Sequence, residues 1–206
     1  MRAFLIIVAL TACSTSTARK PPLAERSAAP PSHSALVLVI DRSGSMQGPK
    51  LAAALDASAA AARTLAPDDI VAVVGFDSEA KVLAAPQPAG EREQLAAELA
   101  LVKAGGGTNI VPGLREAYAL LHASTATTRH VILLSDGEAP SDGLAALIAE
   151  MRSEHMTIST VAVEGADEQL LEQISKDGGG RMYKVTDLKG LSQTFVKETR
   201  VALLAK

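Results

Sequence analysis

An unbroken apolar run at residues 35–40 ends abruptly at the carboxylate of Asp41. Continuous apolar character over the length of one strand is typical of a β-strand that is buried on both faces. Such strands occur mainly in parallel sheets that carry helices on both sides. This run constrains the fold more than any other feature, and it predicts a chain of the α/β class.

Short apolar segments alternate with amphipathic ones along the rest of the chain. Strands are predicted at residues 70–76, 81–85, 130–134, 157–163 and 182–185. Helices are predicted at residues 51–65, 91–103, 111–121, 144–151 and 170–177, with a last helix over 188–204. The more polar strand 81–85 is bounded by Pro86 and is therefore expected at an edge of the sheet. The alternation predicts a doubly wound, mostly parallel six-stranded sheet with helices on both faces.

The N-terminus resembles a bacterial lipoprotein signal peptide. Met1 and Arg2 give a positive start, residues 3–10 are mostly apolar, and small residues precede Cys13, the single cysteine of the chain. The apolar run is too short to span a bilayer, which takes about 20 residues. We expect residues 1–12 to be a signal peptide and Cys13 to be the lipidated residue.

Residues 13–34 are rich in Ser, Thr, Ala and Pro and show no hydrophobic period. This composition is typical of a flexible tether. Residues 35–206 would then form the folded domain. Together with the expected lipid anchor, the tether predicts a protein attached to a membrane of the bacterial cell envelope.

Charge and composition exclude several classes of site. The net charge is −3 and aromatic residues make up 2% of the chain, so neither a basic surface nor a stacking surface for nucleic acid is expected. One cysteine cannot form an internal disulfide. The histidines lack the spacing of zinc ligands and are expected at the surface or in loops. They are His33, His122, His130 and His155.

Three short polar motifs follow predicted strands or a glycine run, and each offers side-chain oxygens. The residues concerned are Asp41, Ser43, Ser45, Thr108 and Asp136. Ligands of doubly wound sheets bind beyond the carboxyl ends of the strands, so these side chains are expected to converge. Oxygen donors select Mg²⁺, Mn²⁺ or Ca²⁺ over softer metals. With only two carboxylates among the donors, we expect the ion to keep positive charge and to seek a carboxylate from a partner.

The motifs Asp41-x-Ser43-x-Ser45, Gly107-Thr108-Asn109 and Ser135-Asp136-Gly137 resemble the metal-ion-dependent adhesion site of von Willebrand factor A domains. The similarity is greatest to bacterial stand-alone and membrane-tethered members, and it runs from residue 35 to the C-terminus. It implies a Rossmann-like sheet with one antiparallel edge strand, which residues 81–85 fit. It also implies that both serines coordinate the metal directly, whereas the other three ligands coordinate directly or through water.

Each motif also has a plain alternative when it is taken alone. Ser45 could cap the helix that starts near Pro49, and the other two motifs could be ordinary turns. Asn109 either caps the following helix or supports Thr108. Asp77 and Ser78, at the end of another strand, either lie near the rim or form a surface turn, and the surface turn is the expected outcome. Convergence of the motifs at one rim favours the metal site.

The expected function is metal-ion-dependent binding of a protein partner that presents Asp or Glu, by a module tethered to the cell envelope. We do not expect an enzyme, because no phosphate loop around Lys50, no nucleophile elbow and no second acid beside Asp41 is present. Two alternatives remain. One is a metal-dependent hydrolase of the phosphatase kind, and the other is a structural subunit of an envelope complex.

Overall fold

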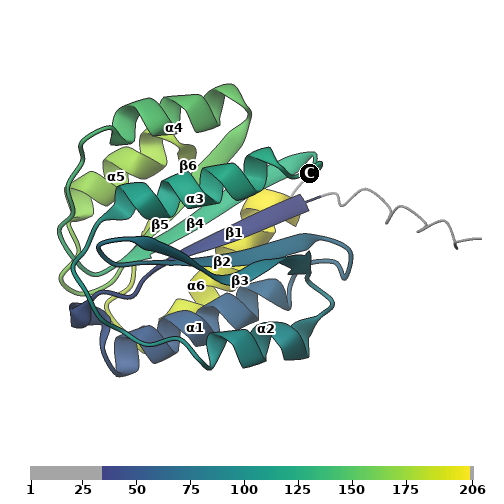
Figure 1. The fold of residues 1–206 in the computed structure, drawn as a ribbon, viewed down its shortest axis with the longest axis horizontal. Coiled ribbons are helices and arrows are strands. Elements are labelled where there is room, and N and C mark those ends of the chain that lie inside the picture. The colour runs from purple at the N-terminus through teal and green to yellow at the C-terminus, as the bar shows by residue number, and fades with distance from the viewer. Residues whose placement is uncertain (1–33, 205–206) are drawn as a thin grey trace, which may run out of the picture.

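A computed structural model describes residues 34–204, and its centre is a six-stranded sheet (Figure 1). The strands are β1 (Ser34–Asp41), β2 (Ile70–Phe76), β3 (Ala80–Pro88), β4 (Thr128–Ser135), β5 (Met156–Ala162) and β6 (Gly179–Lys184). Their order is β3-β2-β1-β4-β5-β6. β3 pairs antiparallel with β2 at one edge, and the other described pairings are parallel. The predicted sheet, with its antiparallel edge strand, is confirmed.

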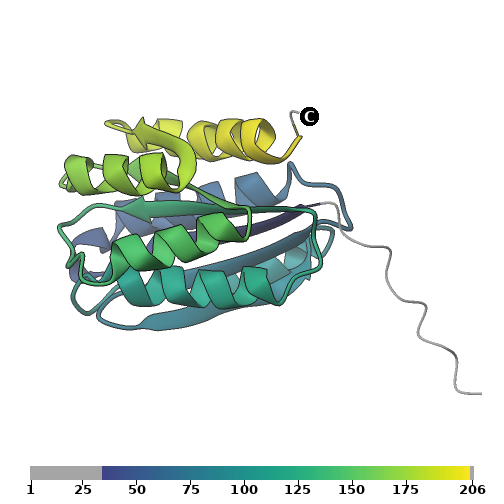
Figure 2. The same cartoon turned by 90° about the horizontal axis from the view of Figure 1, so that it is seen from above.

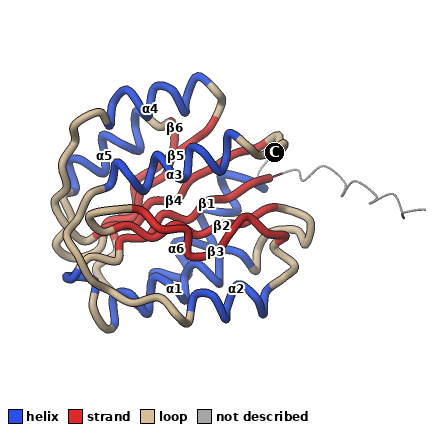
Figure 3. Tube along the Cα trace, viewed as in Figure 1, coloured by secondary structure: helices blue, strands red, loops and turns tan. Residues whose placement is uncertain are grey.

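Helices cover both faces of this sheet, as the turned view and the tube drawing show (Figures 2 and 3). One face carries α1 (Pro49–Ala62), α2 (Arg92–Leu99) and α6 (Leu191–Thr199). The other face carries α3 (Ile110–His122), α4 (Leu144–Ser153) and α5 (Glu168–Asp177). Short helical turns lie at Gly44–Met46 (η1), Leu188–Gly190 (η2) and Arg200–Leu204 (η3). Within residues 34–204, no helix has both the length and the apolar character to cross a membrane.

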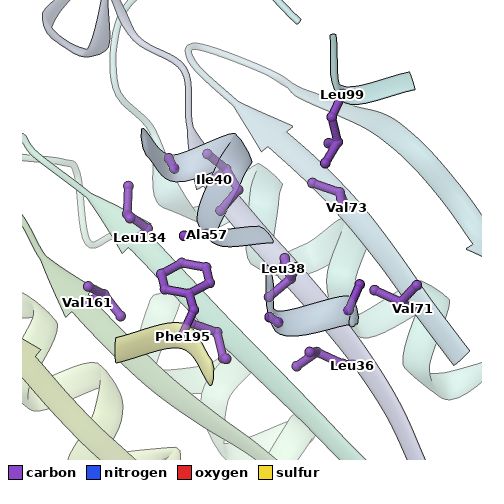
Figure 4. Close-up of a cluster of buried hydrophobic side chains, with 14 of the residues drawn as sticks. Leu36, Leu38, Ile40, Ala57, Val71, Val73, Leu99, Leu134, Val161 and Phe195 are labelled. Atoms are coloured by element: carbon purple, nitrogen blue, oxygen red, sulfur yellow. The ribbon is translucent and has the colours of Figure 1, made fainter. Parts of the chain in front are cut away.

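The apolar run of β1 is divided between two hydrophobic cores. Leu36, Leu38 and Ile40 enter the core under α1 and α6, where Phe195 of α6 is fully buried (Figure 4). The intervening residues of β1 enter the opposite core under α3. Because both faces of β1 are covered, positions 35–40 of the strand need apolar side chains, which explains the unbroken run.

Two predicted helices are shorter than expected. α2 ends at Leu99 rather than near Lys103, and the Lys103 carbonyl accepts a hydrogen bond from Arg42 Nη1 (3.1 Å) instead of continuing the helix. The predicted helix over 188–204 is divided into η2, α6 and η3. Its first turn is a separate 3-10 turn, in which the Asp187 side chain accepts from the Lys189 amide (3.0 Å).

Glycines allow β6 to lie close against β5. The helix predicted over 170–177 should end before Gly178, Gly179 and Gly180, and α5 does end at Asp177. However, Gly179 and Gly180 also belong to β6. A Cβ atom on Gly180 would lie 2.2 Å from the carbonyl oxygen of Ile158. Strand β6 therefore begins earlier than predicted, because the missing side chain permits a backbone approach that no other residue allows.

A buried polar cluster joins α6 to the sheet. Glu198 of α6 is fully buried, and its carboxylate accepts hydrogen bonds from Ser159 (2.6 Å), Tyr183 and Arg181 (3.4 Å). His130 Nε2 lies 3.4 Å from the same carboxylate. The prediction that His130 lies at the surface or in a loop is wrong, because its side chain is buried. The polar groups of this cluster stabilise the ring inside the protein.

The other histidines have different outcomes. His122 is exposed on α3 beside Glu154, and His155 lies in a turn with a φ of 62°. His33, together with the predicted signal peptide and Cys13, falls outside the described residues.

The cluster predicts that Glu198 stabilises the fold only while it is ionised. Burial pushes the pKa of Glu198 upward, but hydrogen bonds from its neighbours outweigh this effect, so the pKa lies below its usual value of 4.5. A lowered folded-state pKa gives stability that is fully present above the unfolded-state pKa and is lost as pH falls through the folded-state pKa. Glu198→Gln should lower the free energy of unfolding by about 3 kcal/mol at pH 7.

The difference between the wild type and Glu198→Gln should shrink as pH falls below 4.5, measured by urea denaturation across that range. Glu172→Gln is the matched control, because Glu172 is exposed on α5. A difference that stays constant with pH would show that the charge of Glu198 is not what stabilises α6.

Candidate metal centre

Four of the five predicted ligands meet where β1 and β4 end side by side. Asp41 is the last residue of β1, and Asp136 directly follows β4. Ser43 and Ser45 lie in the turn after β1, with their hydroxyl oxygens 3.0 Å apart. The Ser45 hydroxyl donates to Asp136 Oδ1 (2.7 Å), which connects the two loops. The contacts lie at the rim where strand order reverses, as the fold predicts.

The carboxylate of Asp41 is fully buried and has neutral hydrogen-bond donors. Its Oδ1 accepts from the Ser43 amide (2.9 Å), and its Oδ2 accepts from the Ser135 hydroxyl (2.6 Å). Burial raises the pKa of Asp41 above its usual value, and the charge of Asp136 adds to the rise. The hydrogen bonds from Ser135 and Ser43 act in the opposite direction. The site therefore contains a carboxylate that a nearby cation would favour in its charged form.

The fifth predicted ligand, Thr108, is carried to the rim by the glycine loop. This loop is bound to the turn after β1 by two backbone hydrogen bonds, from Gly105 to the Arg42 carbonyl (2.8 Å) and from Gly44 to the Gly106 carbonyl (3.2 Å). A Cβ atom on Gly137 would lie 3.4 Å from the Thr108 hydroxyl oxygen. Thr108 is thus beside the turn that holds Asp136.

The plain alternatives for Ser45 and Asn109 can now be separated. The N-cap of α1 is Gly48, and the cap makes no side-chain hydrogen bond, so Ser45 does not cap this helix. Asn109 does cap α3, because its side-chain oxygen accepts from the Val111 amide (3.2 Å).

The prediction of a surface turn is correct for Ser78, which is exposed, but wrong for Asp77. Asp77 is buried and pairs with Arg42, and the Ser78 hydroxyl accepts from the Gly107 amide (3.1 Å). Gly106 has a φ of 83°, and a Cβ atom there would lie 2.9 Å from the Asp77 side chain. The glycine loop can press against Asp77 only because Gly106 has no side chain. The sequence signal for the position of Asp77 at the rim is that it directly follows β2, the neighbour of β1.

Lys50 is a residue of this site that sequence reasoning missed. Its ammonium lies 2.6 Å from Asp136 Oδ2 and donates to the Glu164 carbonyl (2.9 Å). The side chain of Asp136 is fully buried, whereas that of Lys50 is 26% exposed. In the sequence, Lys50 draws attention only as a possible residue of a phosphate loop, and the motif of such a loop is absent around it. A lysine in the first turn of a helix opposes the helix dipole, and this was the available signal.

The donor set fits a hard divalent cation. Two carboxylates and three hydroxyls provide oxygen ligands, the kind that Mg²⁺, Mn²⁺ and Ca²⁺ prefer. Among the residues that the structure describes, no group of three or more His, Cys, Asp or Glu side chains could hold a metal by itself. The hydroxyl groups are therefore needed to complete any site at this rim.

Comparisons with known proteins agree with the fold. The sequence profile of the von Willebrand factor type A domain matches residues 35–197. Calcium-activated chloride channel regulator 1 of Sus scrofa is 33% identical over 156 residues, which cover 73% of this chain and 17% of that protein. The matched region is thus a small part of the relative's length.

Two solved structures show the same architecture. A von Willebrand factor type A protein from Catenulispora acidiphila superposes with a TM-score of 0.77 and 26% identity, over 84% of this chain and 43% of that chain. Proximal thread matrix protein 1 from the mussel byssus, solved with a zinc-occupied MIDAS motif, gives a TM-score of 0.72 and 20% identity. That match covers 84% of this chain and 46% of the mussel protein.

The Arg42–Asp77 ion pair should hold the rim loops in place. Asp77→Ala removes this pair and the acceptor for the Glu79 amide (3.0 Å), so the free energy of unfolding should fall by about 1–2 kcal/mol. Amides at residues 104–108 should exchange with deuterium faster. Asp56→Ala, on the exposed side of α1, should leave this exchange unchanged. Equal exchange in Asp77→Ala and the wild type would rule out this role.

Proposed function

The chain belongs to the von Willebrand factor type A domain family, and from this premise we propose that it is a protein-binding module that acts through a divalent cation. Domains of this family commonly mediate adhesion between proteins. The observation that carries the proposal is the convergence of Asp41, Ser43, Ser45 and Asp136 at the ends of β1 and β4. Ligands of doubly wound sheets bind at this rim, and here the rim carries a set of side-chain oxygen donors.

In the proposed site, Ser43 and Ser45 coordinate the cation directly. Asp41, Thr108 and Asp136 coordinate it directly or through water. The oxygen donors favour Mg²⁺, with Mn²⁺ and Ca²⁺ as alternatives. The mussel byssus protein was solved with zinc in its MIDAS motif, which supports a divalent ion at such a site in this fold.

The proposed partner is a protein that presents an Asp or Glu side chain. Its carboxylate would complete the coordination of the cation, and the side chains around the rim would determine specificity. We propose binding rather than catalysis because the hydrogen bonds of Asp41 come from Ser43 and Ser135, and no described histidine lies with them. His130 pairs with Glu198 instead. A hydrolase would need a nucleophile, a base and an orienting group within reach of one another.

Asp41→Asn should strongly weaken Mg²⁺ binding while preserving the fold. The amide keeps the shape of the side chain but removes a buried charge, so the Tm without metal should be equal or higher. Mg²⁺ affinity, measured by calorimetry, should fall by about a hundredfold or more, because a charged ligand is lost. Asp56→Asn is the matched control on α1. Equal Mg²⁺ affinity in Asp41→Asn and the wild type would reject the proposed site.

The same variant tests partner binding. Partner capture should require Mg²⁺, should be lost in EDTA and should be lost with Asp41→Asn. Capture that is unaffected by both treatments would mean that the partner uses another surface. Hydrolysis of a generic phosphoester with Mg²⁺ or Mn²⁺ by the wild type and not by Asp41→Asn would favour the hydrolase instead.

We also propose that the domain is anchored to the cell envelope by lipid at Cys13. The supporting observation is the position of this cysteine after a short apolar run and small residues. The wild type should incorporate labelled palmitate and sediment with membranes, whereas Cys13→Ala should do neither. Labelling of both proteins, or of neither, would contradict this anchor.

A further inference from the structure

Lys50 lies where a lysine is electrostatically unfavourable for its helix. It is in the first turn of α1, at the positive end of the helix dipole, and that turn contains no acidic residue. The ammonium is held from outside the helix, by Asp136 Oδ2 at 2.6 Å and by the Glu164 carbonyl at 2.9 Å. Tertiary contacts at the rim therefore determine the position of Lys50.

These contacts enclose the carboxylate of Asp136. Both of its oxygens are engaged, one by the Ser45 hydroxyl and the other by Lys50. The loop after β5 packs against the backbone of the same residue, since a Cβ atom on Gly165 would lie 2.7 Å from the Asp136 carbonyl oxygen. A fully buried carboxylate is costly unless it is paired, and Lys50 forms an ion pair with it.

The hydrogen-bond partners of Asp41 differ in charge from those of Asp136. Its hydrogen bonds come from the Ser43 amide and the Ser135 hydroxyl, which carry no charge. One acid of the site is therefore paired with a cation, and the other has neutral donors. The two carboxylates and the ammonium sum to a formal charge of −1.

The formal charge of −1 changes the expectation that two carboxylates alone leave the ion positive. Two carboxylates alone would formally balance a divalent ion and leave no positive charge to attract a partner. With Lys50 included, the site and a divalent ion together carry a charge of +1. The expected attraction for a partner's carboxylate then depends on Lys50.

We propose that Lys50 neutralises Asp136 and thereby leaves a bound divalent cation able to attract the partner's carboxylate. This inference rests on the proposed function, and it assigns Lys50 as a positioning residue that acts through Asp136. Lys50 weakens binding of the metal and strengthens binding of the carboxylate. Its removal should move the two affinities in opposite directions, which loss of a merely structural contact would not do.

A charge series of full-chain variants tests the proposal. The formal site charge is −1 in the wild type, −2 in Lys50→Met, 0 in Asp136→Asn and −1 in the double variant. Mg²⁺ affinity by calorimetry should be about tenfold or more higher in Lys50→Met than in the wild type. The double variant should bind Mg²⁺ more tightly than Asp136→Asn, which should be weakest. Acetate affinity at saturating Mg²⁺, measured by NMR titration, should follow the reverse order.

Two controls separate local charge from other effects. Lys176→Met removes the same charge from the exposed last turn of α5 and should change neither affinity. Lys50→Arg keeps the charge and should stay close to the wild type. Without metal, Lys50→Met should have a lower Tm than the wild type, because Asp136 is left unpaired, and Mg²⁺ should raise its Tm by more.

The outcomes distinguish this inference from the proposed function. If the wild type binds Mg²⁺ but Lys50→Met binds it equally or more weakly, the role of Lys50 is wrong and the proposed site stands. If the wild type binds neither Mg²⁺ nor Mn²⁺, the proposed function itself fails. If Lys50→Met does not fold, Asp136→Asn and the double variant make the same comparison, and equal Mg²⁺ affinity in these two would overturn the inference.

Discussion

The burial of β1 on both faces is the constraint on which the rest of the structure depends. Leu38 and Ile40 pack under one layer of helices, and Val39 packs under the other. The strand therefore occupies the middle of the sheet, between β2 and β4. Its last residue is a carboxylate at a position with no exposure to water. A charge at such a place needs compensation, and the polar rim is built around that requirement.

Compensation comes from two different sources. The Ser43 amide and the Ser135 hydroxyl donate to Asp41, and an ammonium from α1 meets Asp136. The turn after β1 is held to the glycine loop by backbone hydrogen bonds, such as the one from Gly44 to Gly106, and to Asp136 by the Ser45 hydroxyl. Buried acids can therefore lie close together, because each has its own partners and the loops cannot separate easily.

Sequence reasoning could predict much of the fold because the apolar pattern and the glycines are local signals. The parallel sheet and the meeting of the β1 and β4 turns follow from general rules of α/β sheets, whereas the strand order and the antiparallel edge strand follow from the family resemblance. The partners of Lys50, Asp77 and His130 could not be predicted. Each partner lies far away in the sequence, and no local pattern encodes such a pairing. Lys50 and Asp136, for example, are 86 positions apart. The early start of β6 was missed for a similar reason, because it depends on a close approach to Ile158.

The backbone contact between Gly44 and Gly106 has a consequence for how such a domain can be adapted. At this contact between the two loops, neither residue has a side chain, and the contact itself is made by an amide and a carbonyl. Exposed side chains around the rim can therefore be exchanged without altering the geometry that holds the oxygen donors. The domain combines a rim that its own backbone holds in place with replaceable surroundings, which makes it a suitable scaffold for selecting new binding specificities in the laboratory.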